Sequence, residues 1–344
     1  MTGDVILSGG GVVDVRPSAV EPYDSTTTAR IAALDAVSDE HAATLRPANT
    51  ARGYAGDWAK WTAFAEGKQL PFTAATRGTL RAFVAWLWAA GAAPSTIDRR
   101  LAGVVVILRR EHRVTVNPDD TRAARELLKD YVRQAAEDKQ APRGRGQASP
   151  LLLPDLRRIS EACPESLDGL RDRALVLLAF AIAGRRSELA GLTVRGVADD
   201  PNGLVVDVRV SKTKPRTVAV PYGSNPLTCP VRAWRAWRDA AQLHAPESPA
   251  FRRIDRHGRL LGNLSGQAVG EIVTRAGQRA GVEARLTGHS ARAGLATEAR
   301  RAGKDRKAIA ATTGHAPNSP VLDRYLRTVD RWSGDDNALM GIGL

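Results

Sequence analysis

The chain has 344 residues, of which 43% are hydrophobic, so it is long enough for two domains with buried cores. Its 50 lysines and arginines outnumber its 37 aspartates and glutamates, which gives a formal net charge of +13. Such a basic surface favours a polyanionic partner, because it binds phosphate backbones and releases their counterions. Only eight of the basic residues are lysines. The others are arginines, which suit forked phosphate contacts, although a general Arg and Ala bias also raises their number.

The composition also excludes several classes of protein. Cys163 and Cys229 are too few for a disulfide framework or a cysteine-based zinc site, which fits a reducing compartment. No stretch approaches the length of a transmembrane span, and the first residues lack the basic and apolar regions of a signal peptide. We therefore expect a cytoplasmic, nucleoid-associated protein that binds nucleic acid, with no membrane partner and no small-molecule substrate.

The N-terminal part of the chain predicts an arm followed by a helical domain. Residues 1–28 are rich in Gly, Ser, Thr and Pro, which indicates a flexible arm. Residues 29–140 show helical periodicity. One apolar stripe is typical of a buried helix face and not of a base-stacking surface: Tyr54, Trp58, Trp61 and Phe64. A second stripe follows: Leu80, Phe83, Val84, Leu87 and Trp88. Ser95 is expected to cap the next helix of a four- or five-helix domain.

The rest of the chain predicts a second, mostly helical domain. Residues 141–150 combine Pro, Gly and Arg, as in an exposed basic linker. Residues 151–332 are mainly helical, except that 204–221 alternate apolar and polar residues around a turn and so predict a hairpin in a small sheet. Residues 333–344 end with apolar side chains, which suits either docking on a neighbouring subunit or a frayed terminus. The predicted fold class is mainly α with a small β-sheet.

Five short segments carry residues suited to phosphate chemistry: AGRRSEL, SKTK, TGHSARAG, TGHAPNSP and RYLR. His289 and Arg292 are three residues apart, which places both on one helical face. Imidazole and guanidinium groups can hold a phosphate and stabilise charge on its oxygens, while the phenol of Tyr325 can act as a nucleophile. Each segment alone is more often an ordinary helix start, a solvated lysine or a core-edge aromatic. Their conjunction in one order is much less frequent by chance.

A metal site is not expected. The six histidines show no HExxH motif and no paired spacing that would suit a metal: His41, His112, His244, His257, His289 and His315.

Seven residues occur in the order found in tyrosine recombinases: Arg185, Glu188, Lys212, His289, Arg292, His315 and Tyr325. The chain resembles that family of phage integrases, Xer and Cre enzymes. The resemblance implies a two-domain, C-shaped clamp with an N-terminal helical, SAM-like core-binding domain and a C-terminal catalytic domain. It also implies a homotetramer on double-stranded DNA with specific core sites, working without a metal or cofactor.

The family implies a role for each of these residues. Tyr325 would form a 3′-phosphotyrosine, Lys212 would protonate the leaving 5′ oxygen, and Glu188 would orient the phosphate-binding groups. The remaining four would stabilise the transition state, with His289 also a candidate for taking the phenolic proton. Strand exchange would then pass through a Holliday junction.

The chain departs from the family pattern at two places. Ala183 and Gly184 precede Arg185, where the family often has a glycine and then an apolar residue. Tyr325 follows His315 by ten residues, one more than the commonest spacing. Lys214 is a rival for the role of Lys212, and the neighbouring Arg186 is expected at the surface or on the DNA backbone. The alternative functions are a type IB topoisomerase-like strand transferase and a catalytically silent, sequence-specific DNA-binding protein.

Overall fold

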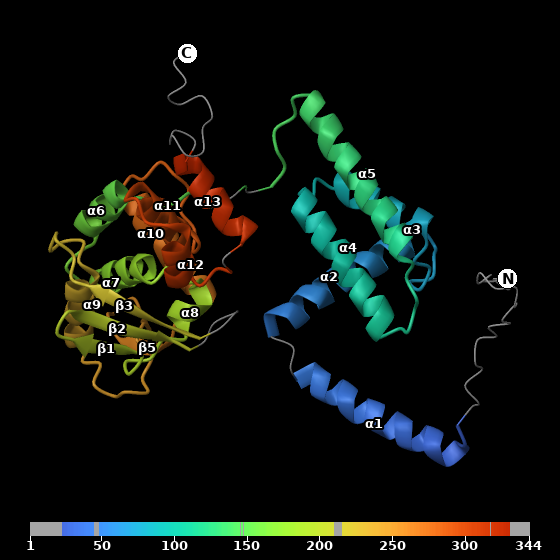
Figure 1. Cartoon of the computed structure of the whole chain (residues 1–344), viewed down its shortest axis with the longest axis horizontal. Helices are drawn as coiled ribbons and strands as arrows, with labels where there is room; N and C mark the ends of the chain where they lie inside the picture. Colours follow the sequence, from blue (N-terminus) through green and yellow to red (C-terminus); the bar gives the residue numbers. More distant parts are fainter. Residues whose placement is uncertain are drawn as a thin grey trace, which may run out of the picture. The chain divides into compact units, whose positions relative to one another are not determined.

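The computed structural model describes residues 23–44, 48–144, 146, 148–209, 215–316 and 318–330. The expected arm before residue 23, Lys212 and Lys214 of the hairpin turn, and the tail at 333–344 lie outside these residues. The chain divides into two compact units, Met1–Gly146 and Gln147–Leu344, drawn in Figure 1. The division falls within the stretch expected to be the linker.

The described part of the first unit is built from five helices: α1 (Ser25–Thr44), α2 (Ala48–Gly67), α3 (Arg77–Ala89), α4 (Pro94–Arg110) and α5 (Pro118–Glu137). Its core forms where the two predicted apolar stripes meet. Trp61 and Phe64 of α2 are buried against Phe83 of α3, and the Trp61 and Phe83 rings pack edge to face with centroids 5.1 Å apart. Trp58 and Trp88, at the edges of the two stripes, are only partly buried.

Two helix starts in this unit differ from the prediction. Helix α1 begins at Ser25, inside the stretch assigned to the arm, because Asp24 Oδ1 accepts hydrogen bonds from the backbone N–H groups of Thr26 and Thr27 at 2.9 Å each. The prediction that Ser95 caps the next helix was wrong. Helix α4 begins at Pro94, whose fixed φ suits the first helical position, and its N-cap Ala93 forms no side-chain bond.

The second unit combines helices with two small antiparallel sheets (Figure 1). Its described helices are α6 (Leu153–Ala162), α7 (Leu167–Ala181), α8 (Arg186–Ala190), α9 (Pro230–Ala240), α10 (Gly266–Arg279), α11 (Ser290–Arg301), α12 (Arg306–Thr313) and α13 (Pro320–Asp330). Its strands are β1 (Val197–Asp200), β2 (Gly203–Val208), β3 (Arg216–Pro221), β4 (Arg252–Ile254) and β5 (Leu260–Asn263). Strands β1, β2 and β3 form one sheet in that order, and β4 pairs with β5.

The predicted hairpin is confirmed by the pairing of β2 with β3. Val206 lies opposite Val218, and Leu204 lies opposite Val220. These four side chains are buried in the main core of the unit, because alternate residues of a strand point to the same face. The sheet therefore fixes where β3 begins and which of its side chains face inward.

A glycine in α11 allows the chain to enter this unit. A Cβ atom on Gly294 would lie 2.0 Å from the carbonyl oxygen of Leu151, which is closer than any real contact. The N–H of Leu151 donates to the carbonyl of Ser290 at 2.9 Å. The start of the unit is thus tied directly to the helix that carries Arg292.

The cysteines and the longest helices bear on two expectations from composition. Both cysteines are buried and unpaired. Among the residues that the structure describes, no helix combines the length and apolar character needed to cross a membrane.

Candidate active site

Arg185 and Glu188 are positioned by the sharp turn after α7. That helix ends at Ala181, and Ala183 adopts a left-handed φ of 47°, a conformation unusual for a residue other than glycine. Arg185 is then the N-cap of α8. Glu188 Oε2 accepts from the Arg185 backbone N–H at 3.0 Å, and its Oε1 accepts from Arg185 Nη1 at 2.6 Å.

Glu188 is shared with a second arginine, Arg216 of β3. Arg216 Nη2 donates to Glu188 Oε2 at 2.9 Å and to the carbonyl of Ile182 at 3.0 Å. Glu188 is 1% exposed. Burial alone would raise the pKa of this carboxyl, but hydrogen bonds from Arg216 and then Arg185 lower it to about 2. The carboxylate therefore stays ionised and holds two guanidinium groups in place.

Arg292 adds a third, more deeply buried guanidinium. It is 4% exposed, and its Nη1 donates to the carbonyl of Ala183 at 3.0 Å. Its Nη2 is buried without a hydrogen-bond partner among the described residues. Burial, and then the charge of Arg185, lower the pKa of Arg292 to about 10, so it remains a cation at neutral pH. A buried N–H donor on a cation is a group that an anion would satisfy.

Arg216 is not among the residues predicted from the sequence. The signal was available, since Arg216 shares the inward side of β3 with Val218 and Val220, two and four residues on. A charged residue at an inward strand position needs a buried partner of opposite charge. A Cβ atom on Gly314 would lie 3.3 Å from Arg216 Cδ, so this side chain also contacts the segment immediately before His315.

His289 lies at the N-cap of α11, beside Arg186. Partial burial, then the charge of Arg186, and then those of Arg292 and Arg185 lower the pKa of His289. The side chain of His289 is exposed to solvent over much of its surface. The three positive charges also lower the pKa of His289, so its direction of change is the same without burial. His289 is therefore neutral at pH 7.

Arg186 is exposed, as expected, but glycines confine its stem. A Cβ atom on Gly288 would lie 2.2 Å from Arg186 Cδ, and one on Gly270 of α10 would lie 3.0 Å from the same atom. The stem thus runs between the glycine that precedes His289 and a glycine of α10. The sequence did not reveal this groove, because its walls are far apart along the chain.

His315 follows the C-terminal turn of α12, which Gly314 closes with a left-handed φ of 63°. Thr313 Oγ1 lies 2.7 Å from the carbonyl oxygen of Ile309 and 2.8 Å from His315 Nδ1. The hydroxyl proton points either to that carbonyl, with Nδ1–H donating to Oγ1 and Nε2 left able to accept, or to Nδ1 itself. Burial, and then the charges of Arg292 and Arg185, lower the pKa of His315 to about 4.

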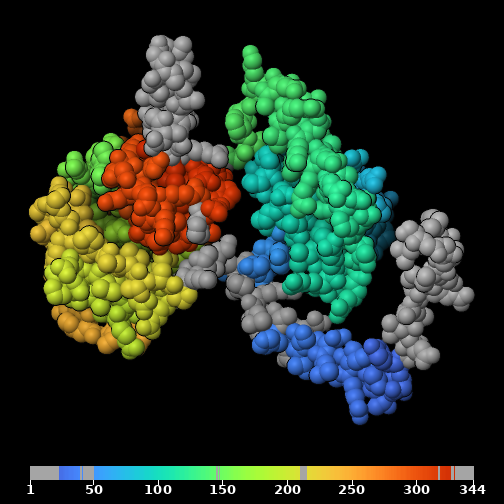
Figure 2. Space-filling model, in the orientation of Figure 1, coloured from blue at the N-terminus to red at the C-terminus, as the bar shows by residue number. Residues whose placement is uncertain are grey.

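Tyr325 is carried by α13 on a small core of its own. The buried members of this core come from α11, α12 and α13: Ala296, Ile309, Ala310, Leu322 and Leu326. Tyr325 is half-buried against it, and its ring centroid lies 6.4 Å from that of His315. In the space-filling view the C-terminal helices, in orange and red, form one continuous surface (Figure 2). These three helices thus set the position of the phenol relative to the guanidinium groups.

The structure brings six of the seven predicted residues together: Arg185, Glu188, His289, Arg292, His315 and Tyr325. The seventh, Lys212, lies outside the described residues. Three guanidinium groups around one carboxylate leave an excess of positive charge next to a phenol, which suits binding of a phosphate and attack upon it. In the described parts of the chain, no three His, Cys, Asp or Glu side chains converge as a metal site would require.

Comparison with known proteins places this geometry in a family. Residues 151–331 match the family model described as Phage integrase family. The chain is 30% identical over 298 residues to the integrase/recombinase xerD homolog of Selenomonas ruminantium, covering 85% of this chain and 84% of that protein. The chain belongs to the phage integrase family. It is a tyrosine recombinase, an enzyme that breaks and rejoins DNA, so the family resemblance of its motifs is confirmed.

Solved recombinase structures share its fold. The XerH site-specific recombinase bound to palindromic difH substrate matches with a TM-score of 0.57 at 15% identity, covering 83% of this recombinase and 80% of that chain. The Tn1549 transposon integrase in complex with transposon right end DNA matches with a TM-score of 0.57 at 12% identity, covering 85% and 92%. The predicted fold class, mainly helical with small antiparallel sheets, is confirmed. The matches support recombination over the topoisomerase-like and catalytically silent alternatives.

Replacing Glu188 with Gln should make the free energy of unfolding of this recombinase vary less with pH in the acid range. The folded-state pKa of about 2 lies below the ordinary 4.5, so Glu188 contributes about 3 kcal/mol above pH 4.5, and this contribution is lost as the pH falls toward 2. Urea unfolding of both proteins across this range should show the largest difference near neutral pH and a shrinking one in acid. Glu271→Gln, an exposed carboxylate, should change the free energy of unfolding by less than about 0.5 kcal/mol. A constant difference between wild type and Glu188→Gln at every pH would contradict the assignment.

Replacing Gly288 with Ala should push Arg186 out of its groove and raise the pKa of His289, because a neighbouring positive charge is removed. An NMR titration of the His289 ring should show the increase. Arg186→Ala should raise this pKa by a similar amount, and combining the two substitutions should add little. An unchanged His289 pKa in Arg186→Ala would show that Arg186 does not contribute to the shift, which would leave burial, Arg292 and Arg185 as its causes.

Proposed function

We propose that this recombinase cuts and rejoins double-stranded DNA at specific core sites through a covalent 3′-phosphotyrosine on Tyr325. The observation that supports this most directly is the buried, unsatisfied Nη2 of Arg292. It belongs to a cluster in which Arg185 and Arg216 share Glu188, and in which the phenol is electrostatically coupled to Arg292. A scissile phosphate would supply the missing acceptor and neutralise the excess charge.

In the first proposed step, the Tyr325 oxygen bonds to phosphorus while the bond from phosphorus to the 5′ oxygen breaks. Arg185 and Arg292 stabilise the charge on the non-bridging oxygens. The phenolic proton passes to His289, whose lowered pKa keeps the imidazole neutral and able to accept it. His315 is a rival acceptor in the tautomer that carries its proton on Nδ1 and directs it at Thr313, because Nε2 is then bare.

His315 has a second proposed role once DNA is bound. An adjacent phosphate anion raises the pKa of an imidazole, which opposes the effect of the neighbouring arginines. His315 would then bind a proton on Nε2 and donate it in a hydrogen bond to a non-bridging oxygen. Glu188 and Arg216 act by positioning the other groups.

Lys212 is the proposed donor of the proton to the leaving 5′ oxygen, with Lys214 as its rival. A leaving alkoxide is strongly basic, and a positioned acid contributes a rate factor on the order of 10²–10⁴. Strand β2 ends at Val208 and strand β3 begins at Arg216, so both lysines belong to the segment of sequence that joins these two strands.

Rejoining reverses this chemistry with a different 5′ hydroxyl. That hydroxyl attacks the phosphotyrosine, the bond from phosphorus to Tyr325 breaks, and no ATP is needed because the bond energy is conserved. Exchange between two duplexes needs four active sites, and we propose a homotetramer acting through a Holliday junction. A lambda integrase tetramer bound to a Holliday junction matches the fold with a TM-score of 0.51 at 14% identity, covering 87% of this chain and 80% of that one.

We assign the core-binding domain to the helical unit Met1–Gly146 and the catalytic domain to Gln147–Leu344. Each unit has its own core, which supports independent domains joined near residues 141–150. The expected place of action is DNA in the cytoplasm, at the nucleoid.

Replacing Tyr325 with Phe should keep DNA binding and abolish cleavage, because the ring and its packing remain while the nucleophilic oxygen is removed. A nicked suicide substrate that traps the covalent intermediate should give a protein–DNA band on a denaturing gel for the wild type only. Tyr222→Phe, which removes an exposed phenol elsewhere in the same unit, is the matched control and should retain the band. A covalent band in Tyr325→Phe would reassign the nucleophile.

A substrate with sulfur at the bridging 5′ position should separate the roles of Lys212 and Arg185. The leaving thiolate needs no proton, so Lys212→Ala should regain cleavage on it, whereas Arg185→Ala should not, since charge on the non-bridging oxygens still needs stabilisation. Cleavage rates on the oxygen and sulfur substrates are the measurement. Rescue of Lys214→Ala instead would move the acid role two residues along, and rescue of neither lysine variant would leave both with a positioning role only.

A further inference from the structure

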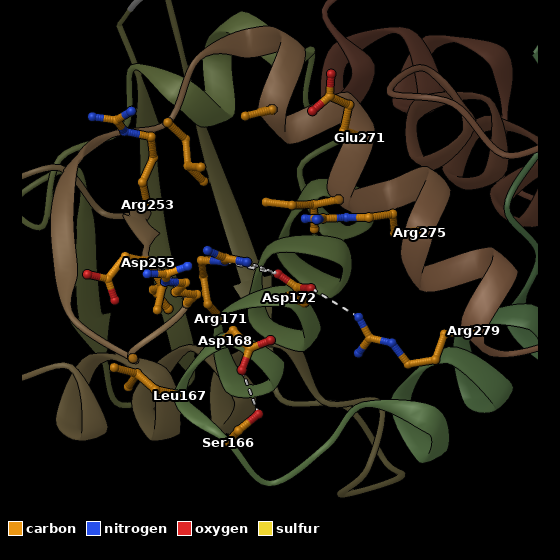
Figure 3. A pocket seen from close by; sticks show the side chains of 16 residues that line it. Ser166, Leu167, Asp168, Arg171, Asp172, Arg253, Asp255, Glu271, Arg275 and Arg279 are labelled. Carbon is orange, nitrogen blue, oxygen red and sulfur yellow. Dashed lines mark hydrogen bonds and ion pairs between the residues drawn. The ribbon is translucent and has the colours of Figure 1, made fainter.

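A second cationic site lies in the unit Gln147–Leu344, away from the cluster around Glu188. It is a cavity of about 650 Å³ enclosed by the start of α7, the β4–β5 hairpin and α10 (Figure 3). A cavity of this size is within the range that holds small organic ligands.

Helix α10 separates this cavity from the candidate active site. Ala268, Ile272 and Arg275 line the cavity and follow one another at four and three residues, so they share one face of the helix. Gly270, which confines the stem of Arg186, is about 200° away from Ala268 at about 100° per residue and so lies on the opposite face. The cavity is therefore distinct from the site that holds Arg185.

Buried charge is concentrated in the wall of the cavity. Arg171 is 5% exposed and donates through Nε at 2.9 Å and Nη2 at 2.6 Å to the same oxygen of Asp172. Arg279 Nη2 lies 3.4 Å from the other oxygen of Asp172, so a single buried carboxylate serves two guanidinium groups. Removing the charges of Arg171 and Asp172 from water costs free energy that their attraction often does not recover, so this ion pair need not stabilise the fold.

Arg275 adds a guanidinium that extends across the cavity toward Arg171 (Figure 3). Within the described ranges it forms no ion pair with an acidic side chain. The acidic side chains of the wall are engaged locally, Asp168 with the hydroxyl of Ser166, Asp255 with backbone N–H groups of its own turn, and Glu271 with the amide of Gln267. These bonds come from neutral groups, so the three carboxylates keep their charge. The wall carries five arginines against four carboxylates, a formal charge of +1, and the guanidinium of Arg275 is the one that extends into the cavity opposite Arg171.

Part of the wall is apolar. It is formed by five side chains that surround the charged groups: Leu167, Ile254, Leu264, Ala268 and Ile272. Two guanidinium groups next to an apolar wall match a ligand with an anionic end and an organic body.

We propose that this cavity binds a phosphate-bearing organic anion of nucleotide size, with the phosphate between Arg171 and Arg275 and the organic body on the apolar wall. Guanidinium groups bind phosphate by forked, charge-assisted hydrogen bonds, which gives the site its selectivity for this anion. A free nucleotide and the terminal nucleotide of a DNA end share this chemistry. The proposal does not depend on the recombination mechanism, because none of its residues belongs to the cluster around Glu188.

Fluorescence anisotropy of the full chain with an N-methylanthraniloyl derivative of adenosine triphosphate tests the proposal. Wild type should show saturable binding. Arg275→Glu should weaken it about tenfold or more, since a charge-assisted bond is replaced by repulsion. Arg157→Glu makes the same charge change on the exposed face of α6 and should stay within about twofold of wild type. Arg185→Ala should also bind as wild type does.

Three results would overturn the proposal. They are an absence of saturable binding to wild type, equal weakening by Arg275→Glu and Arg157→Glu, and loss of binding in Arg185→Ala alone, which would place the probe in the active site. Competition in the Arg185→Ala background identifies the source of the anion. Displacement by pyrophosphate but not by adenosine supports a free phosphate compound, and stronger displacement by a short blunt duplex supports a DNA end. Displacement by adenosine but not by pyrophosphate contradicts anchoring by phosphate.

Discussion

The ion pairs of Glu188 are the interaction on which the catalytic unit depends. This carboxylate is almost fully buried, caps the start of α8 and accepts hydrogen bonds from Arg185 and Arg216. Arg216 in turn donates to the carbonyl of Ile182, at the end of α7. One side chain therefore ties together α7, α8 and the sheet. Removing its charge would leave two largely buried cations without their shared partner, which is among the most destabilising changes a core can undergo.

The same arrangement explains why the site is ready for an anion. Arg292 is held by a single carbonyl, that of Ala183, and burial together with the nearby Arg185 lowers its pKa. Holding this cation in a buried position therefore has an electrostatic cost. A phosphate diester entering the site would relieve that cost, and the gain would grow as negative charge accumulates in the transition state. Ala183, whose carbonyl oxygen accepts the hydrogen bond from Arg292, is the residue with the left-handed φ of 47°.

Glycines decide how closely the parts of the site approach one another. Gly294 lets the chain at Leu151 cross α11, and Gly288 leaves room for the stem of Arg186. Gly314 permits the left-handed turn before His315 and contacts Arg216. A methyl group at Gly294 or Gly288 would meet another part of the chain. Contacts made in the folded unit therefore explain the glycine that precedes each of the two site histidines, Gly288 before His289 and Gly314 before His315.

The sequence by itself determined the fold class, the helical stripes of the first unit, the β2–β3 hairpin and the order of the catalytic motifs. Those features depend on local periodicity, such as the alternation of apolar and polar residues in β2 and β3, and on the residue types that phosphate chemistry requires. It placed the N-cap of α4 incorrectly, since Ser95 and Pro94 both signal a helix start and the fixed φ of proline prevailed. Only the tertiary structure decided that Arg216 shares Glu188, that Arg186 lies between two glycines, and that Thr313 contacts the ring of His315. Most of these contacts join residues far apart in the chain, and all of them depend on distances and burial that no local pattern encodes.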